Sequence, residues 1–293
     1  MDRILVTGGL GYVGGHLLKR LQNGPSKVSL LVRQDELDHS LKSKFQLLTI
    51  EELELNAKDE QFNIVINLAG KYSFDHQKVG VNELLSSNVV LPIRVAAAIS
   101  RSGTRVHWVQ ASTFMQHVDG LDRKPSCFYA STKQTVEDLL GYFENDSFHV
   151  TSLVFPHIFG EGDKREKLIN LFLRSVKTGN TIQLSSGSQA MDLVHVEDIV
   201  NAFEMVIKTD GLAGRWQISS GRLIRVAEIA EFVNLNSQNG IRFQFDPTRD
   251  RPFDCYELWI NAPALPNWRP EKELFTWLAD QLRSLDPSFK SSS

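Results

Sequence analysis

Cysteine is scarce in this chain, which contains only Cys127 and Cys255 among its 293 residues. Two cysteines cannot build a disulfide framework, and no spacing typical of a metal site accompanies them. We therefore expect reduced cysteines, no bound metal and a cytoplasmic protein.

An excess of basic charge and a long apolar run are also missing. The formal net charge is −3 and the sequence pI is about 6.3, so the basic surface that nucleic acids require is absent. The longest apolar segment, residues 89–99, contains Pro92 and Arg94 and is too short to span a bilayer. The sequence opens directly as a strand, M-D-R-I-L-V-T-G-G, so we expect no signal peptide and no membrane partner.

Apolar strands and helix-period segments alternate along the first 155 residues. Strands are predicted at residues 3–7, 28–32, 64–68, 106–111 and 150–155, and helices at residues 11–21, 84–101 and 128–143. Such alternation indicates a parallel sheet with helices on both faces, which right-handed crossovers make an α/β doubly wound Rossmann fold.

The alternation loosens after residue 160. Shorter helices, predicted at residues 164–177, 197–208, 226–233 and 271–285, mix with short strands. We expect a dinucleotide-binding domain at residues 1–160 and a smaller α/β substrate-binding lobe at residues 161–287, with chain crossings between them. The tail at residues 288–293 is predicted to be disordered.

A glycine-rich loop joins the first predicted strand to the first helix. Residues 5–14 read L-V-T-G-G-L-G-Y-V-G, with glycines at Gly8, Gly11 and Gly14. One glycine serves the tight turn, one the close approach of a pyrophosphate, and one the packing of helix on strand. The helix that begins near Tyr12 and Val13 offers unpaired N–H groups to phosphates. This pattern predicts dinucleotide binding rather than a tight turn alone.

Arg33 directly follows the second predicted strand, where a carboxylate usually binds the ribose of NAD(H). A guanidinium can pair with the 2′-phosphate of NADP(H), so Arg33 favours NADP(H). Asp35 lies close enough in sequence to reach a ribose, which leaves NAD(H) possible. Arg33 could also be an exposed loop residue without a ligand.

Tyr129 and Lys133 form a Tyr-x-x-x-Lys pair on the predicted helix at residues 128–143, where positions four apart share one face. A phenol is a poor acid or base at neutral pH, but a nearby ammonium favours the phenolate and lowers its pKa. Tyr129 is therefore a candidate acid/base, and Lys133 can also hold the ribose hydroxyls of the nicotinamide half of a cofactor.

The strand that precedes this helix delivers two hydroxyls to its carboxyl end, in the sequence Q-A-S-T-F-M-Q at residues 110–116. Ligands of doubly wound sheets bind at that edge. Thr113 can therefore hydrogen-bond the same substrate oxygen that Tyr129 protonates, although Ser112 and Thr113 could instead only cap the strand.

Taken together, these motifs resemble the extended short-chain dehydrogenases/reductases of the nucleotide-sugar epimerase/dehydratase group, over nearly the whole length. Beside the glycine loop and the Thr113, Tyr129 and Lys133 set, the matching segments are N-L-A-G at residues 67–70, Asn88, F-G-E-G-D at 159–163, D-L-V-H-V-E-D at 192–198 and L-P-N-W-R-P at 265–270. The resemblance implies that Leu68, Ala69, Gly70, Lys71, Asn88 and Pro156 line the cofactor. It also implies that Arg249 and Arg251 hold the nucleotide diphosphate.

Departures from the family pattern bear on the reaction. The 4,6-dehydratases of the family follow the threonine with Asp-Glu, whereas this chain has Phe114-Met115, which cannot transfer protons. His157 replaces a family asparagine and could bind a substrate hydroxyl or phosphate, or serve the structure alone. With Arg33, these changes resemble NADPH-dependent 4-ketoreductases of deoxysugars, the paratose and abequose synthase type.

The resulting hypothesis is NADPH-dependent reduction of the 4-keto group of a nucleotide-linked deoxyhexose, with Tyr129 as proton donor. An NAD-dependent nucleotide-sugar epimerase is the alternative. A non-catalytic cofactor sensor is a third, which would have no need of Thr113, Tyr129 and Lys133 together.

The resemblance further implies a homodimer through a four-helix bundle built from residues 84–101 and 128–143. Apolar residues at 95–98 and at Val136, Leu139 and Leu140 could form that surface. Burial inside one subunit would explain the same residues.

Overall fold

The computed structural model describes residues 1–285 apart from positions 38, 239, 252–253 and 255–256. It divides into two compact units. The first unit contains Met1–Phe155, Val200–Ile218 and Ile260–Trp268, and the second contains the other described residues. The predicted disordered tail and Cys255 lie outside the described residues, whereas Cys127 is a free thiol.

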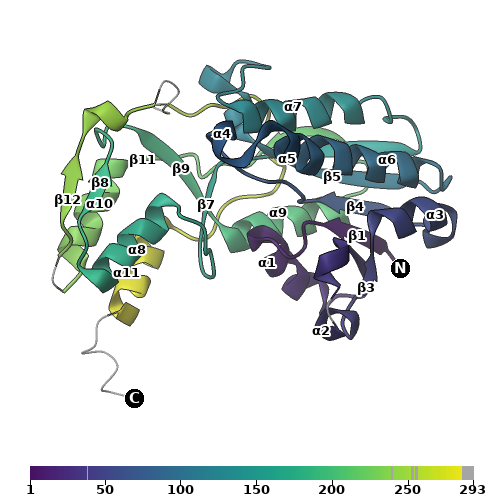
Figure 1. Cartoon of the computed structure of the whole chain (residues 1–293), viewed down its shortest axis with the longest axis horizontal. Coiled ribbons are helices and arrows are strands. Elements are labelled where there is room, and N and C mark those ends of the chain that lie inside the picture. Colours follow the sequence, from purple (N-terminus) through teal and green to yellow (C-terminus); the bar gives the residue numbers. More distant parts are fainter. Residues whose placement is uncertain (38, 239, 252–253, 255–256, 286–293) are drawn as a thin grey trace. The chain divides into compact units, whose positions relative to one another are not determined.

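A seven-stranded sheet forms the centre of the first unit (Figure 1). Every neighbouring pair of strands is parallel, in the order β10-β6-β5-β4-β1-β2-β3. The strands are β1 (Arg3–Thr7), β2 (Lys27–Leu31), β3 (Gln46–Leu48), β4 (Ile64–Asn67), β5 (Val106–Thr113), β6 (Phe148–Phe155) and β10 (Gly214–Gln217). The strand order reverses between β1 and β4, so the α/β doubly wound fold predicted from the sequence is confirmed.

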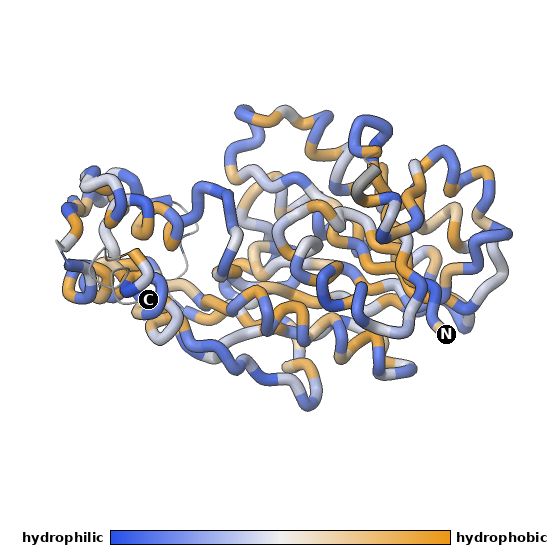
Figure 2. Tube along the Cα trace, turned by 90° about the horizontal axis from the view of Figure 1, so that it is seen from below, coloured by the Kyte–Doolittle hydropathy of each residue, from blue (hydrophilic) through white to orange (hydrophobic). Residues whose placement is uncertain are grey.

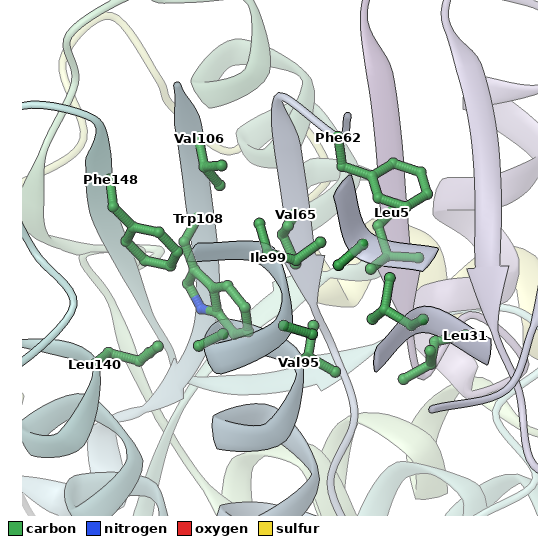
Figure 3. Packing of buried hydrophobic residues seen from close by; sticks show 14 of the residues in the cluster. Leu5, Leu31, Phe62, Val65, Val95, Ile99, Val106, Trp108, Leu140 and Phe148 are labelled. Atoms are coloured by element: carbon green, nitrogen blue, oxygen red, sulfur yellow. The ribbon is translucent and has the colours of Figure 1, made fainter. Parts of the chain in front are cut away.

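One face of this sheet is covered by α3 (Ile50–Glu60), α6 (Leu91–Ser100) and α7 (Phe128–Leu140). Side chains of these helices meet the strands in one apolar cluster. Figure 3 shows Val95 of α6 and Leu140 of α7 in this cluster together with Leu5, Val65 and Trp108. The Trp108 ring stacks on Phe148 with centroids 6.0 Å apart. Figure 2 colours the trace by hydropathy. Ile4, Val65 and Trp108, on the adjacent strands β1, β4 and β5, are fully buried, which fits a parallel sheet covered on both faces.

The other face carries α1 (Tyr12–Leu21) and residues 200–208 of α9 (Val196–Lys208) (Figure 1). Arg20 of α1 donates to Asn201 at 3.2 Å and to Glu204 at 2.8 Å, which joins the two helices. The remaining helical turns of the first unit are η1 (Gln34–Glu36), α2 (His39–Lys42), α4 (His76–Val79), α5 (Val81–Leu85), η2 (Ser86–Val90), η3 (Phe114–Gln116) and η4 (Val118–Gly120).

The helical stretch Val81–Ser100 corrects one expectation. By length and composition it could cross a membrane, whereas the sequence analysis found no run that long. Its α6 part is a core helix, since Val95 and Ile99 are fully buried. Arg94 on the same helix donates to both carboxylate oxygens of Glu54, at 2.8 and 2.7 Å.

The second unit has a three-stranded sheet in the order β11-β9-β7 and a two-stranded sheet in the order β12-β8. Its strands are β7 (His157–Phe159), β8 (Ile182–Leu184), β9 (Ala190–His195), β11 (Leu223–Arg225) and β12 (Phe243–Phe245). Its helices are α8 (Leu168–Thr178), α10 (Val226–Asn236), η5 (Pro247–Arg249) and α11 (Leu274–Leu285), with the start of α9. A separate apolar core, which includes Phe172, Val233 and Leu278, holds these elements together.

Candidate active site

The glycine loop between β1 and α1 leaves no room for side chains at two of its glycines. Gly8 has φ +67°, and a Cβ there would lie 2.6 Å from the Ala69 nitrogen. A Cβ on Gly14 would lie 2.4 Å from the Gly8 carbonyl oxygen. The Gly11 N–H closes the turn on that same oxygen at 3.0 Å. The two glycines therefore let the loop pack closely on residues 68–69 and on the start of α1, as the glycine motif of a dinucleotide site requires.

A buried chain of polar side chains links the carboxyl ends of β1, β4 and β5. The Thr7 hydroxyl donates to Asn67 Oδ1 at 2.5 Å and accepts from the Ala69 N–H at 3.2 Å. The Asn67 amide donates to Gln110 Oε1 at 2.8 Å. These bonds fix residues 68–70 beside the glycine loop, where the resemblance to the family placed the cofactor. Sequence reasoning did not assign roles to Thr7 and Gln110.

Asn88 lies in η2, a π-helical turn inside the stretch Val81–Ser100. Its Oδ1 accepts from the Lys71 N–H at 2.6 Å, and its amide donates to the Lys71 carbonyl at 3.0 Å and to Thr132 Oγ1 at 2.9 Å. The buried amide therefore joins the segment after β4 to α7. π-turns recur at functional sites because they redirect a helical side chain.

Lys133 is 4% exposed and donates from Nζ to the Ala111 carbonyl at 3.1 Å. A Cβ on Gly70 would lie 3.2 Å from Lys133 Nζ and 3.3 Å from Asn88 Oδ1, so the three residues meet at one point. Burial lowers the pKa of Lys133 to about 8, although the nearby Glu137 carboxylate opposes this shift.

Tyr129 lies one helical turn before Lys133 and is half-buried. Its ring meets the ring of Tyr72 edge to face, with centroids 5.0 Å apart. Tyr72 is exposed and follows Lys71 directly, so it packs against the candidate acid/base from the segment after β4. Sequence reasoning missed Tyr72, for which no motif gives a signal.

Thr113 ends β5, and its hydroxyl accepts from the Met115 N–H at 3.4 Å. It thus caps η3, while its own hydroxyl proton can be donated. The two hydroxyls differ, because Ser112 donates to the carboxylate of Glu137 on α7. Phe114 and Met115 are half-buried in η3 and place no acid beside Thr113.

Arg33 follows β2 with its side chain 73% exposed. Its guanidinium pairs with Asp35 at 3.3 Å and with Glu36 at 2.9 Å. A 2′-phosphate at this position must therefore compete with two carboxylates. The sequence analysis proposed Arg33 and Asp35 for the cofactor site, but it did not predict that Arg33 pairs with Glu36.

Apart from Thr113, the predicted substrate residues lie in the second unit. Burial, together with the charges of Lys167 and Arg251, lowers the pKa of His157 to about 3. Burial also lowers the pKa of Lys167 to about 8, with Arg165 contributing. Lys167 and Arg251 therefore place two cationic side chains near His157, whose own ring stays neutral. Lys167 was not among the sequence candidates.

Arg249 and Pro156 are the other two predicted site residues of the second unit. Arg249 lies against the Gln183 carbonyl at 3.4 Å and the Asp246 carboxylate at 3.7 Å. Pro156 directly precedes His157, at the start of the second unit.

Two of the family-like segments meet through Glu161. Its carboxylate contacts His195 Nε2 at 3.1 Å and accepts from the Trp277 indole at 2.6 Å. The Glu197 N–H donates to His195 Nδ1 at 3.2 Å, so the proton of the neutral ring lies on Nε2, toward Glu161. This arrangement holds the ends of β7 and β9 to α11. The family-like segments at residues 159–163 and 192–198 therefore have a structural role in the second unit.

A family model described as the NAD dependent epimerase/dehydratase family matches residues 4–218. The chain is 21% identical over 267 residues to a CDP-abequose synthase of Salmonella muenchen, covering 90% of each chain. It is 26% identical over 220 residues to the enzyme of that name from Yersinia pseudotuberculosis, covering 71% of this chain and 74% of the other. A human dTDP-D-glucose 4,6-dehydratase is 23% identical over 303 residues, with 92% and 85% covered.

Solved structures share the fold. MoeE5 in complex with UDP-glucuronic acid and NAD superimposes with a TM-score of 0.79 at 20% identity, covering 97% of this chain and 99% of the other. The UDP-glucose 4-epimerase of Thermus thermophilus in complex with NAD gives 0.77 at 19%, covering 96% and 99%. The family match includes the glycine loop, Tyr129 and Lys133, and the chain therefore belongs to the NAD dependent epimerase/dehydratase family, extended short-chain dehydrogenases/reductases that act on nucleotide sugars with a nicotinamide cofactor.

Proposed function

We propose that this enzyme reduces the 4-keto group of a nucleotide-linked deoxyhexose with NADPH. The observation that carries the proposal is the apolar pair Phe114 and Met115 after Thr113, with Tyr129 and Lys133 in place on α7. The site has an acid/base for redox chemistry at a carbonyl, but lacks the two adjacent acids that would expel water. Similarity to two proteins named CDP-abequose synthase supports the same reaction class.

In this proposal the bound cofactor supplies a hydride to the carbonyl carbon. Tyr129 donates its phenolic proton to the carbonyl oxygen, and the Thr113 hydroxyl orients that oxygen. Lys133 stabilises the phenolate that remains and binds the ribose. Gly8, Gly11, Gly14 and the start of α1 hold the pyrophosphate, with residues 68–71, Asn88 and Pro156 lining the cofactor and Arg33 pairing with the 2′-phosphate.

Lys167 and Arg251, near the neutral His157 in the second unit, support an anion site in this proposal. These two cations suit the diphosphate of a nucleotide sugar, with Arg249 as a further cation. A neutral His157 can donate one hydrogen bond and accept another, so it can bind a phosphate oxygen or a sugar hydroxyl.

A panel of nucleotide-4-keto-6-deoxyhexoses tests the proposal, with NADPH and NADH compared side by side. Stoichiometric loss of NADPH with one sugar supports it. Tyr129→Phe should reduce turnover at least about 10²-fold and leave cofactor affinity intact, because it removes only the proton donor. Normal turnover by this variant would contradict the mechanism.

An NAD-dependent epimerase is the second candidate. The ion pairs of Arg33 with Asp35 and Glu36 favour it, since they compete with a 2′-phosphate. An epimerase consumes no cofactor, so NAD retained through purification, together with no net NADPH loss, would support it.

We also propose a cytoplasmic homodimer through α5, α6 and α7. Val95, Ala96, Ala98, Val136 and Leu140 are buried within the subunit, so they cannot form the contact surface considered in the sequence analysis. Leu85, Val90, Leu139 and Tyr142 are exposed on or just after the same helices and suit the contact better. A combined Val90→Asp, Leu139→Asp variant should elute as a monomer, and an unchanged mass would contradict the dimer surface.

A further inference from the structure

Glu137 is a carboxylate on α7 that sequence reasoning did not single out. It lies one helical turn after Lys133, so Tyr129, Lys133 and Glu137 share one helix face. Its side chain is only 7% exposed. A buried carboxylate is costly unless charged and polar partners compensate it, so its surroundings indicate what it does.

Those partners come from the end of β5 and the turn after it. Glu137 accepts from the Ser112 hydroxyl and from the Gln116 amide, the latter at 3.0 Å. Gln116 in turn accepts from the Thr113 N–H at 3.0 Å. The Gln116 side chain therefore connects the Glu137 carboxylate to the Thr113 N–H through two hydrogen bonds.

Arg215 on β10 supplies the compensating charge at 3.3 Å. Its guanidinium is held by Asp122 at 3.0 Å and by Asn261 at 2.8 Å. The other titratable groups facing this pair are Lys133 on α7 and His117 after η3, where burial and the charge of Arg215 lower the pKa of His117. The carboxylate thus joins α7, β5 and β10 in the first unit.

We propose that Glu137 is a positioning residue that fixes the end of β5 against α7, and thereby sets the Thr113 hydroxyl relative to the Tyr129 hydroxyl. Lys133 bonds Ala111, Glu137 bonds Ser112, and Gln116 carries the connection to Thr113. These bonds fix the positions of residues 111–113 relative to α7, the helix that carries Tyr129. The catalytic part of this inference rests on the proposed ketosugar reduction.

Glu137→Gln tests the role, because it keeps the shape and removes the charge. We expect kcat to fall ~10–100-fold, as small misplacements of reacting groups do, with less than about a 3-fold change in KM for the cofactor. Removing a negative charge near Lys133 also lowers the pKa of that lysine. The fall of kcat at alkaline pH should therefore begin at a lower pH. Glu54→Gln is the matched control, since it breaks an ion pair between α3 and α6 and should leave both measurements unchanged.

Hydrogen exchange of the Thr113 amide gives a readout that needs no turnover. The amide should exchange faster in Glu137→Gln than in the unaltered protein, but not in Glu54→Gln. If the unaltered enzyme reduces no ketosugar, the proposed function fails, while this exchange still tests the hydrogen-bond chain. Unchanged exchange would overturn the chain, and an unchanged kcat and pH profile would overturn the positioning role.

If Glu137→Gln does not fold, Gln116→Met decides the question. This variant cuts the connection to Thr113 and leaves the Glu137 charge in place. Faster Thr113 exchange and a lower kcat, without a shift of the alkaline limb, are expected. A wild-type kcat and exchange rate would overturn the proposal.

Discussion

Lys133 and Ala111 are joined by a 3.1 Å hydrogen bond from the buried ammonium to the backbone carbonyl, which ties α7 to the end of β5. The Ala111 carbonyl and the nearby Glu137 carboxylate compensate the charge in part, but burial is the largest influence on the pKa of Lys133 and lowers it to about 8. The ammonium at the centre of the site is therefore close to losing its proton at mildly alkaline pH.

This predicts how the stability of the protein depends on pH. Between the native pKa of about 8 and the ordinary lysine pKa of 10.5, the unfolded chain binds the proton that native Lys133 releases, so stability rises with pH. Relative to Lys133→Met, the unaltered protein should gain roughly 2 kcal/mol between pH ~8 and ~9.5, at about 1.4 kcal/mol per unit. Urea unfolding measures this. Lys58→Met, at an exposed lysine, is the control, and parallel curves for Lys133→Met and the unaltered protein would contradict the prediction.

The lowered pKa of His157 predicts how stability changes at acid pH. Its native pKa of about 3 lies below the usual value of 6.5, so acidification below that value protonates the unfolded chain first. The contribution is present above pH ~6.5 and is lost as pH falls, by as much as about 2 kcal/mol at pH ~5. His157→Gln should therefore lose less stability on acidification than the unaltered protein. His76→Gln, at an exposed histidine, serves as control, and equal acid sensitivity of all three proteins would refute the assignment.

Two glycines of α1 give a matched pair. Gly14→Ala places a Cβ 2.4 Å from the Gly8 carbonyl oxygen, whereas Gly15→Ala meets nothing within 4 Å. Gly14→Ala should cost about 1–3 kcal/mol of stability and lower dinucleotide affinity at least ~10-fold, because the loop must move. Gly15→Ala should stabilise α1 by about 0.5–1 kcal/mol and leave affinity unchanged. Calorimetric titration with each nucleotide measures the affinities. Equal affinities of the two variants would contradict a role of the glycine loop in dinucleotide binding.

Arg33 and Glu36 test the choice of cofactor. Arg33→Ala should weaken NADPH binding about 10-fold relative to NADH, because one charge-assisted contact to phosphate is lost. Glu36→Gln should strengthen NADPH binding relative to NADH, since it releases the guanidinium from its 2.9 Å ion pair. The ratio of the two dissociation constants is the measurement. A ratio that neither variant changes would exclude Arg33 from the cofactor site.

The doubly wound fold could be predicted because its signals are local. The strands of the central sheet are nearly continuous apolar segments, and the glycine loop has its own spacing. β3 and α3 were not predicted, although the Thr49 and Glu52 capping box before α3 is legible in the sequence. The helix expected from residue 164 begins at Leu168, because the Asp163 carboxylate binds the Arg165 N–H and guanidinium and holds that segment in a turn.

Site residues could be predicted from the sequence only where they belong to motifs. Tyr129 and Lys133 are four residues apart and Thr113 ends a strand, so pattern and topology bring them together. Glu137 and Arg215 are 78 residues apart, and their pairing depends on β10 joining the edge of the sheet next to β6. The bonds of Asn88 to Lys71 and Thr132 likewise join residues far apart in the sequence, which no local pattern reveals.

Isotope transfer tests the central claim most directly. The enzyme is incubated with NADPH that carries deuterium at the transferable position and with the nucleotide-4-keto-6-deoxyhexose that it consumes. The account predicts one deuterium at the sugar C4 for each NADPH oxidised, and none with Tyr129→Phe. Product without deuterium, formed with no net oxidation of NADPH by a protein that retains NAD, would contradict reduction and favour epimerisation.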